Sequence, residues 1–215
     1  MKIEVINLEK SFGKHQIISG FSHEFNAGSF TAIKGASGTG KTTLLNMLGL
    51  LESADEGEYY LDGKLLKKLT PRVHRNLYRT TFSFVFQDYG LMLNESVQTN
   101  LSLATRFTKN KRHKNKQAYL LTLAKVGLSA EYLNMKAYEL SGGEQQRVAI
   151  ARLMLKPTKI ILADEPTGSL DDTNARQMLS FLRQFAAEGK TVIMVTHSKN
   201  FDDYFDEIIN LTSYN

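Results

Sequence analysis

A glycine-rich loop carries the most specific chemistry in the sequence. It runs Gly35, Ala36, Ser37, Gly38, Thr39, Gly40, Lys41, Thr42 and fits the spacing G-x-x-x-x-G-K-[ST]. Glycines let the backbone curl so that several N–H groups point at phosphate oxygens. Lys41 would place its charge on the β- and γ-phosphates, Thr42 would place its hydroxyl on Mg²⁺, and Thr43 continues the phosphate-binding set. The pattern predicts a nucleoside triphosphate site; the alternative is a glycine-rich turn with a chance Lys-Thr pair.

Two adjacent carboxylates follow an apolar run near residue 160. Asp164 and Glu165 come directly after Ile160–Ala163, and ligands of open α/β sheets bind at the carboxyl ends of strands. Successive side chains on a strand diverge, so the two acids take different tasks. Asp164 would hold Mg²⁺ through water, and Glu165 would polarise or deprotonate an attacking water. The alternative is a solvated acidic turn before Pro166.

Alternating and apolar runs predict the elements that position these residues. Short unbroken apolar runs are typical of strands buried on both faces of a parallel sheet, and an apolar stripe after the loop predicts a helix from about Lys41. The predicted strands are 3–8, 29–34, 82–86, 159–163, 191–195 and 207–211, with a turn at 62–63 and a crossover helix over 172–188. We therefore expect one α/β domain over residues 1–215, with a helical insertion at about 88–157.

Composition excludes several classes of protein. The 215 residues include no cysteine, which excludes disulfide scaffolds, Cys-ligated zinc, Fe–S clusters and thiol catalysis. No run of 18 or more apolar residues predicts a membrane span, and the first residues do not form a signal peptide. The net charge of +5 permits anionic partners without selecting one. The length is that of one domain, with no room for a fused membrane part.

The stretch Leu140–Arg147, LSGGEQQR, resembles the signature of the nucleotide-binding subunits of ATP-binding-cassette (ABC) transporters. The same residues also fit a capping box, with Ser141 and Glu144 at the start of a helix. The resemblance implies a P-loop NTPase (RecA-like) core with a parallel sheet, an N-terminal antiparallel β subdomain and a helical insertion subdomain. It also implies a head-to-tail dimer in which Ser141, Gly142 and Gly143 face the γ-phosphate of the ATP bound to the second copy.

Further positions match the family one at a time. Phe12 stands where the family usually has a tyrosine that stacks on adenine. Gln87 resembles the glutamine that contacts the metal or water, so the implied metal set is Thr42, Gln87 and Asp164. His197 resembles the histidine that holds the γ-phosphate, and 169–171 resembles the loop that links the two active sites. With Glu165 and His197 both present, the resemblance implies a cassette that hydrolyses ATP with Mg²⁺.

The run 163–171 resembles the branch that includes lipoprotein-release, macrolide-export and cell-division cassettes, and 86–97 is most similar to cassettes of bacteriocin-type peptide export. The implied partners are a second copy and a membrane permease at the cytoplasmic face, with no nucleic acid. The alternatives are a regulatory ATPase that gates a partner such as a cell-wall hydrolase, and an ABC ATPase that acts on nucleic acid. The basic run 106–116 is interpreted as a solvated loop, the alternative being contact with the anionic membrane leaflet.

Overall fold

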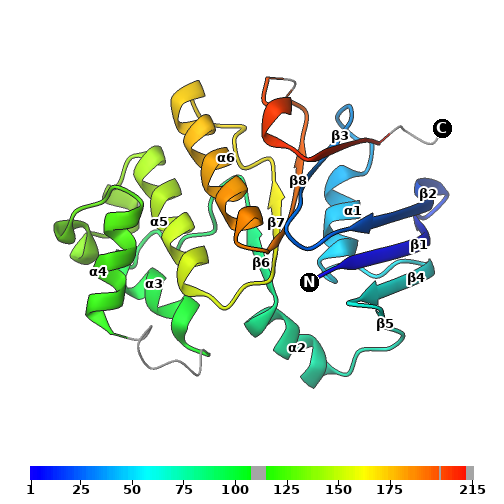
Figure 1. The fold of residues 1–215 in the computed structure, drawn as a ribbon, viewed down its shortest axis with the longest axis horizontal. Coiled ribbons are helices and arrows are strands. Elements are labelled where there is room, and N and C mark those ends of the chain that lie inside the picture. Colours follow the sequence, from blue (N-terminus) through cyan, green and yellow to red (C-terminus); the bar gives the residue numbers. More distant parts are fainter. Residues whose placement is uncertain (108–114, 199, 212–215) are drawn as a thin grey trace.

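The computed structural model describes residues 1–107, 115–198 and 200–211. It has two sheets and the helices that pack on them (Figure 1). The predicted α/β architecture, with a parallel sheet, an N-terminal antiparallel sheet and a helical segment in the middle of the chain, is confirmed. Most of the basic run 106–116 lies outside the described residues.

The N-terminal sheet is antiparallel, in the order β2-β1-β4-β5. Its strands are β1 (Ile3–Phe12), β2 (His15–Phe25), β4 (Glu56–Leu61) and β5 (Lys64–Leu65). The predicted strand at 3–8 is correct but short, because pairing with β2 continues to Phe12. The predicted turn between β4 and β5 is also confirmed: Asp62 and Gly63 both have positive φ, at 48° and 73°, as a two-residue hairpin turn requires.

The second sheet is parallel, in the order β6-β7-β8-β3-β9. Its strands are β3 (Phe30–Lys34), β6 (Phe82–Val85), β7 (Ile160–Asp164), β8 (Thr191–Thr196) and β9 (Glu207–Asn210). Every residue of β3 and β8 is buried, which explains the continuous apolar run Val192–Val195 inside β8. Because these strands are parallel, the carboxyl ends of β6, β7, β8 and β3 lie side by side at one end of the sheet, which we call its carboxyl edge.

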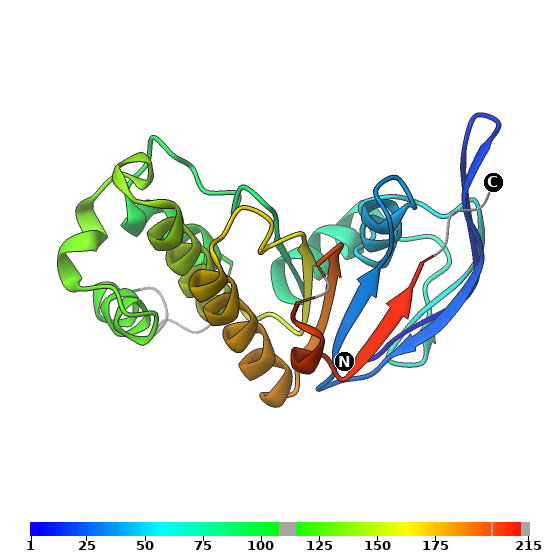
Figure 2. The ribbon, with the colours of Figure 1, turned by 90° about the horizontal axis from the view of Figure 1, so that it is seen from above.

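Helices cover both faces of this sheet (Figures 1 and 2). They are α1 (Lys41–Leu48), α2 (Pro71–Thr80), α3 (Val97–Thr105), α4 (Lys116–Lys125), α5 (Gly142–Leu155) and α6 (Asp172–Ala187). On one face, α1 lies between the parallel sheet and the antiparallel sheet and shares their core. On the other face, α5 and α6 pack in a second core with α3 and α4. Of the described residues, no helix has the length and apolar character needed to span a membrane.

The C-terminal end of α1 packs closely against the parallel sheet. A Cβ on Gly49, the residue after α1, would lie 2.5 Å from Phe84 Cζ and 2.6 Å from Leu162 Cδ1. We expect Gly49→Ala to lower the free energy of unfolding by about 1–3 kcal/mol, since the added methyl overpacks the core. Denaturant unfolding measures this, with Gly142→Ala as the control because nothing lies within 4 Å of its Cβ. Equal stability of the two variants would contradict the expectation.

Candidate active site at the carboxyl edge of the parallel sheet

The loop after β3 has the geometry of a phosphate cradle. Gly38 and Gly40 have φ values of 81° and 88°, in the left-handed region that residues with a Cβ avoid. A Cβ on Gly40 would also lie 2.6 Å from Ile17 Cγ2 of β2. Gly40 is the N-cap of α1 and provides no side-chain hydrogen bond to the helix. The first amides of α1 therefore remain available to an anion at the positive end of the helix dipole.

Two side chains of α1 face this loop and the acidic pair. Lys41 is buried, and its Nζ donates to the carbonyl oxygens of Gly35 at 3.0 Å and Ala36 at 2.7 Å. Its ammonium group is thus held inside the loop, where phosphates would meet it. The Thr42 hydroxyl donates to Asp164 Oδ1 at 3.2 Å. A hydroxyl and a carboxylate placed side by side provide oxygen ligands of the kind that Mg²⁺ takes.

Asp164 ends β7 in a partly buried position. Burial raises the pKa of this carboxyl group, the hydrogen bond from Thr42 opposes the rise, the charge of Glu165 adds to it, and the charge of Lys41 opposes it. Burial disfavours the charged form of a carboxyl group, and shifted pKa values of this kind cluster at functional sites. The donor set fits Mg²⁺, which when bound would neutralise phosphate charge at this position.

Glu165 and Asp164 contact different partners, as expected for adjacent positions at a strand end. Glu165 Oε1 lies 2.9 Å from His197 Nδ1, which follows β8. Glu165 Oε2 is buried and has no hydrogen-bond partner among the described residues. A cleft of about 170 Å³ borders both side chains. The orphaned oxygen beside a cleft is the arrangement that a water-activating carboxylate requires, because it leaves one acceptor for a water.

The backbone at Glu165 is held in an uncommon conformation. Its φ is 46°, a value that costs a residue with a side chain about 1 kcal/mol or more and is enriched at functional sites. The Glu165 amide donates to the Val195 carbonyl of β8 at 3.1 Å, and its carbonyl accepts from the Gly168 amide at 3.0 Å. These two bonds fix the turn that orients the carboxylate.

Gln87 lies two residues after the end of β6, the strand that pairs with β7. Its Nε2 is 3.6 Å from the position of a Cβ on Gly168, so the amide is at the turn that follows Glu165. The side chain is exposed. The guanidinium of Arg152, from α5, donates to the carbonyl oxygens of Tyr89 at 2.7 Å and Gly90 at 2.6 Å. Arg152 thus positions the loop that carries Gln87.

The signature residues lie apart from the phosphate loop in the structure. Ser141 is the N-cap of α5, on the opposite face of the parallel sheet from α1 (Figure 2). The predicted capping box is present: Glu144 accepts from the Ser141 amide at 2.7 Å and from its hydroxyl at 2.8 Å. The Tyr132 hydroxyl donates to Glu144 at 2.6 Å, and this bond, followed by those from Ser141, lowers the pKa of Glu144. Ser141 and Gly142 are exposed and Gly143 is partly exposed, so a partner can reach them.

Phe12 lies at the end of β1, in the hairpin with β2. Half of its surface is exposed, at 51%, and Lys10 Nζ is 5.2 Å from the ring centroid. Because Ile17 of the same hairpin contacts Gly40, the hairpin lies beside the phosphate loop. An exposed ring at such a place is suited to stacking on a base.

The comparison with known families agrees with this arrangement. The family described as ABC transporter matches residues 18–168. This chain belongs to that family. The match covers the phosphate loop, the signature and the acidic pair, which are the motifs that predicted membership. The structure of the family's cassettes also confirms the predicted P-loop NTPase fold: a chain from Clostridium perfringens, cbiO1, has a TM-score of 0.85 at 24% identity, over 98% of this chain and 84% of that one.

Curated relatives of this cassette are macrolide export ATP-binding/permease proteins, MacB. The protein of Mannheimia succiniciproducens is 38% identical over 213 residues, which is 97% of this chain and 33% of the relative. The protein of Brucella melitensis is 38% identical over 198 residues, 91% of this chain and 30% of the relative. The chain thus spans about a third of the length of these relatives. The predicted macrolide-export-like branch is confirmed.

A solved cassette, MJ0796, resembles this one over nearly its whole length. Its structure, described as dimeric, has a TM-score of 0.84 and 33% identity, with 97% of this chain and 94% of that chain covered. A second structure of MJ0796 is described as a dimeric post-hydrolysis state bound to ADP and Pi, with the same TM-score of 0.84.

Gln146 and Asn174 join the signature to the loop at 169–171. The sequence analysis did not single out either residue. Asp171 is the N-cap of α6 and accepts from the Asn174 amide at 3.0 Å and its side-chain Nδ2 at 2.6 Å. Gln146 is buried, and its Nε2 donates to the Asn174 carbonyl at 3.3 Å. Asn174 Oδ1 also lies 3.1 Å from the position of a Cβ on Gly143. Gln146 stands inside the signature, which was a signal, but Asn174 has no signal in the sequence.

Proposed function

We propose that this cassette is the ATP-hydrolysing subunit of an ABC transporter and powers a membrane permease that exports or releases a peptide, a lipoprotein or a toxic compound. The observation that carries the proposal is the division of the site. The phosphate loop, Asp164 and the Glu165–His197 pair share one edge of the sheet, whereas Ser141 is exposed on the far face. Each half is intact and needs its complement from a second copy.

The catalytic half would act through named groups. Amides of the phosphate loop and the Lys41 ammonium bind the phosphates of ATP. Thr42 and Asp164, with Gln87 at the adjacent strand end, would hold Mg²⁺, which neutralises phosphate charge when bound. Glu165 takes the proton of the attacking water through the oxygen that lacks a partner. His197, held by Glu165 Oε1 at 2.9 Å, contacts the γ-phosphate.

The second copy would complete each site. Ser141 and the glycines after it present a helix N-terminus to the γ-phosphate, where backbone amides and the dipole favour negative charge. The dimeric state of the relative MJ0796 supports this assembly. The dimer would form around ATP and open after hydrolysis, and the loop at Gln87 would transmit the change to the permease at the cytoplasmic face of the membrane. The relation to MacB supports an export system, and the similarity of 86–97 to peptide-export cassettes favours a peptide as cargo.

The dependence of ATPase activity on protein concentration tests this proposal. If each site needs two chains, the activity per molecule of the purified cassette should rise with protein concentration until dimers form, and chelation of Mg²⁺ by EDTA should abolish it. The measurement is phosphate release over a dilution series at saturating ATP. Activity per molecule that stays constant on dilution would contradict the shared site, and absence of ATP hydrolysis at all concentrations would contradict the enzyme.

A further inference from the structure

Lys10 is a buried lysine near the end of β1 that belongs neither to the phosphate loop nor to the acidic pair. Only 7% of its surface is exposed. Three oxygens surround its Nζ: the Ser53 carbonyl at 2.9 Å, Glu52 Oε1 at 2.9 Å and Asp55 Oδ1 at 3.1 Å. An ammonium group has three donors, so these three oxygens, which we call the lysine cradle, fix its position.

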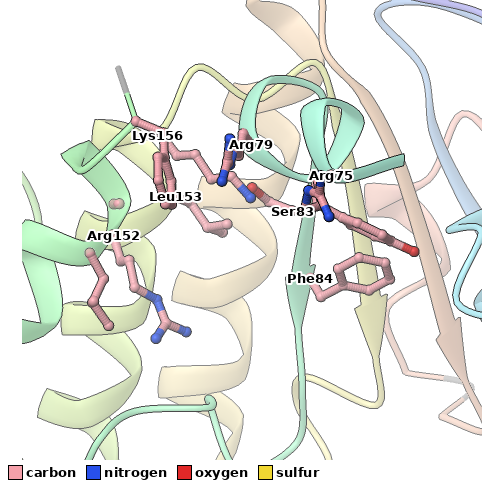
Figure 3. A pocket seen from close by; sticks show the side chains of 11 residues that line it. Arg75, Arg79, Ser83, Phe84, Arg152, Leu153 and Lys156 are labelled. Atoms are coloured by element: carbon pink, nitrogen blue, oxygen red, sulfur yellow. The ribbon is translucent and has the colours of Figure 1, made fainter. Parts of the chain in front are cut away.

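The lysine cradle keeps Lys10 charged. Hydrogen bonds to Glu52 and then to Asp55 raise the pKa of Lys10. Lys156 is the contrasting case: it lines a groove among α2, β6, α3 and α5 (Figure 3), where burial and then the charge of Arg152 lower its pKa to about 8. Because a buried ion pair contributes little net stability, the lysine cradle points to a role other than stability.

Asp55 also fixes the backbone that leads to Phe12. Its amide donates to the Glu9 carbonyl at 2.9 Å, and its Oδ2 accepts from the Ser11 amide at 2.7 Å. β4 begins one residue later, at Glu56, so the Asp55 side chain continues the pairing of β1 where the β4 ladder ends. The last residues of β1 are therefore held from both sides, by β2 and by Asp55.

The ammonium of Lys10 holds the ring of Phe12. The two residues are two apart at the end of β1, and Lys10 Nζ lies 5.2 Å from the ring centroid. A cation is attracted to the face of an aromatic ring. One face of the ring is thus occupied by the ammonium, while half of the surface of Phe12 stays exposed and its other face is available to a base.

The lysine cradle is attached to the helix that starts at the phosphate loop. The amides of Leu51 and Glu52 donate to the carbonyl of Asn46, in α1, at 2.8 and 3.3 Å, so this segment folds back on the end of the helix. Lys41 is the first residue of the same helix. Helix α1 therefore connects the groups that would hold the phosphates with the groups that hold the Phe12 ring.

We propose that Lys10, held in the lysine cradle, is a positioning residue for ATP: it holds the Phe12 ring in the orientation that stacks on the base. This inference rests on the proposed function, in which the phosphate loop binds ATP. A ring that is ordered before binding loses less conformational freedom when the base arrives, and ordering one such side chain costs about twofold to tenfold in affinity. Lys10 acts through Phe12 and touches no reacting atom.

Calorimetric titration of the purified cassette with ATP and with inorganic tripolyphosphate tests the inference, with EDTA present so that ATP is not hydrolysed. Lys10→Met keeps a side chain of similar length and removes the charge. We expect it to weaken the binding of ATP by about threefold to tenfold. Tripolyphosphate has no base to stack, so its affinity should stay at the wild-type value. With Mg²⁺ restored, the KM for ATP should rise and kcat should be kept.

Two further variants control for damage to the fold. Lys2→Met is the matched control, because Lys2 precedes β1 at its opposite end and also pairs with two carboxylates, Glu24 at 2.9 Å and Glu4 at 3.4 Å; both affinities should stay unchanged. Asp55→Ala removes part of the lysine cradle from a side chain that is 46% exposed, and it should weaken the binding of ATP in the same sense as Lys10→Met. It decides the question if Lys10→Met does not fold.

A double-mutant cycle with Phe12→Ala shows whether Lys10 acts through the ring. Loss of the ring should weaken the binding of ATP by about fivefold or more. In the Phe12→Ala background, Lys10→Met should have no further effect, because the ring that Lys10 positions is gone. An equal effect in both backgrounds overturns the inference. So does an equal loss for ATP and tripolyphosphate, or tighter binding of ATP by Lys10→Met, which would mean that the ammonium occupies the face that the base needs.

These outcomes are distinct from failure of the proposed function. A wild-type cassette that binds ATP and never hydrolyses it, with the cycle as expected, contradicts the proposed function alone. Hydrolysis by the wild type, together with unchanged ATP affinity in Lys10→Met and Asp55→Ala, overturns the inference alone.

Discussion

Glu165→Gln is expected to lower ATP turnover by about 10²–10⁴-fold while leaving ATP binding intact, since general-base catalysis contributes a factor of this size. Glutamine has the same shape, keeps a hydrogen-bonding group near His197 Nδ1, which lies 2.9 Å from Glu165 Oε1, and cannot accept the proton of water. The phosphate-binding groups, Lys41 and the amides around it, belong to a different loop. The variant should therefore bind ATP and stop before hydrolysis.

A closed dimer should accumulate in this variant when MgATP is present. Size-exclusion chromatography with light scattering would show the dimer, and phosphate release would show the loss of turnover. Glu131→Gln is a suitable control, because this exposed glutamate of the short helix Ala130–Asn134 loses the same charge far from the acidic pair. Unchanged turnover in Glu165→Gln would remove Glu165 from the role of general base.

The sequence predicted most of the parallel sheet because strands buried on both faces have short, continuous apolar runs. The runs at 159–163 and 191–195 are continuous and apolar, and they became β7 and β8 with small changes at their ends. The hairpin turn at Asp62-Gly63 was also predictable, since both residues tolerate positive φ. Local chemistry determines each of these features, so no knowledge of distant residues was needed.

Helix α2 was missed although its start has a local signal. Thr70 and Pro71 form a standard N-cap and first-turn pair, but the helix buries no residue and so has no apolar stripe. Hydrophobic periodicity, which predicted α1, cannot detect a helix whose residues are mostly polar and exposed. The partial or full exposure of every side chain of α2 is what hides the helix from such analysis.

Contacts between strand ends could not be predicted from spacing. Glu165 and His197 are 32 residues apart in the chain, and they meet because β7 pairs with β8. Strand order depends on tertiary packing, which no single segment specifies. The positive φ of Glu165, 46°, is equally invisible, because no glycine marks the position. The roles assigned to Glu165 and His197 remain predictions. The sharpest prediction follows from the separation of Ser141 and Lys41, which lie on two faces of the sheet.

A mixture of two inactive variants is expected to recover ATPase activity. Lys41→Ala removes a phosphate ligand from one half-site, and Ser141→Arg places a bulky cation at the N-terminus of α5 in the other half-site. Each variant alone forms dimers with both sites damaged. In a mixed dimer of head-to-tail geometry, both changes fall in the same site and the other site is intact. Random association at a 1:1 ratio should therefore restore about a quarter of the wild-type number of sites.

The fold provides a control that must fail to recover. Glu165 and Lys41 belong to the same half-site, because Thr42, next to Lys41, contacts Asp164, next to Glu165, at 3.2 Å. In a mixture of Lys41→Ala with Glu165→Gln, every site of a mixed dimer carries one lesion, so activity should stay at the level of the single variants. Phosphate release across mixing ratios should peak at 1:1 for the first pair and remain flat for the second. Full activity of either Lys41→Ala or Ser141→Arg alone, or recovery in both mixtures, would contradict a site shared between two copies, since only the head-to-tail arrangement distinguishes the pairs.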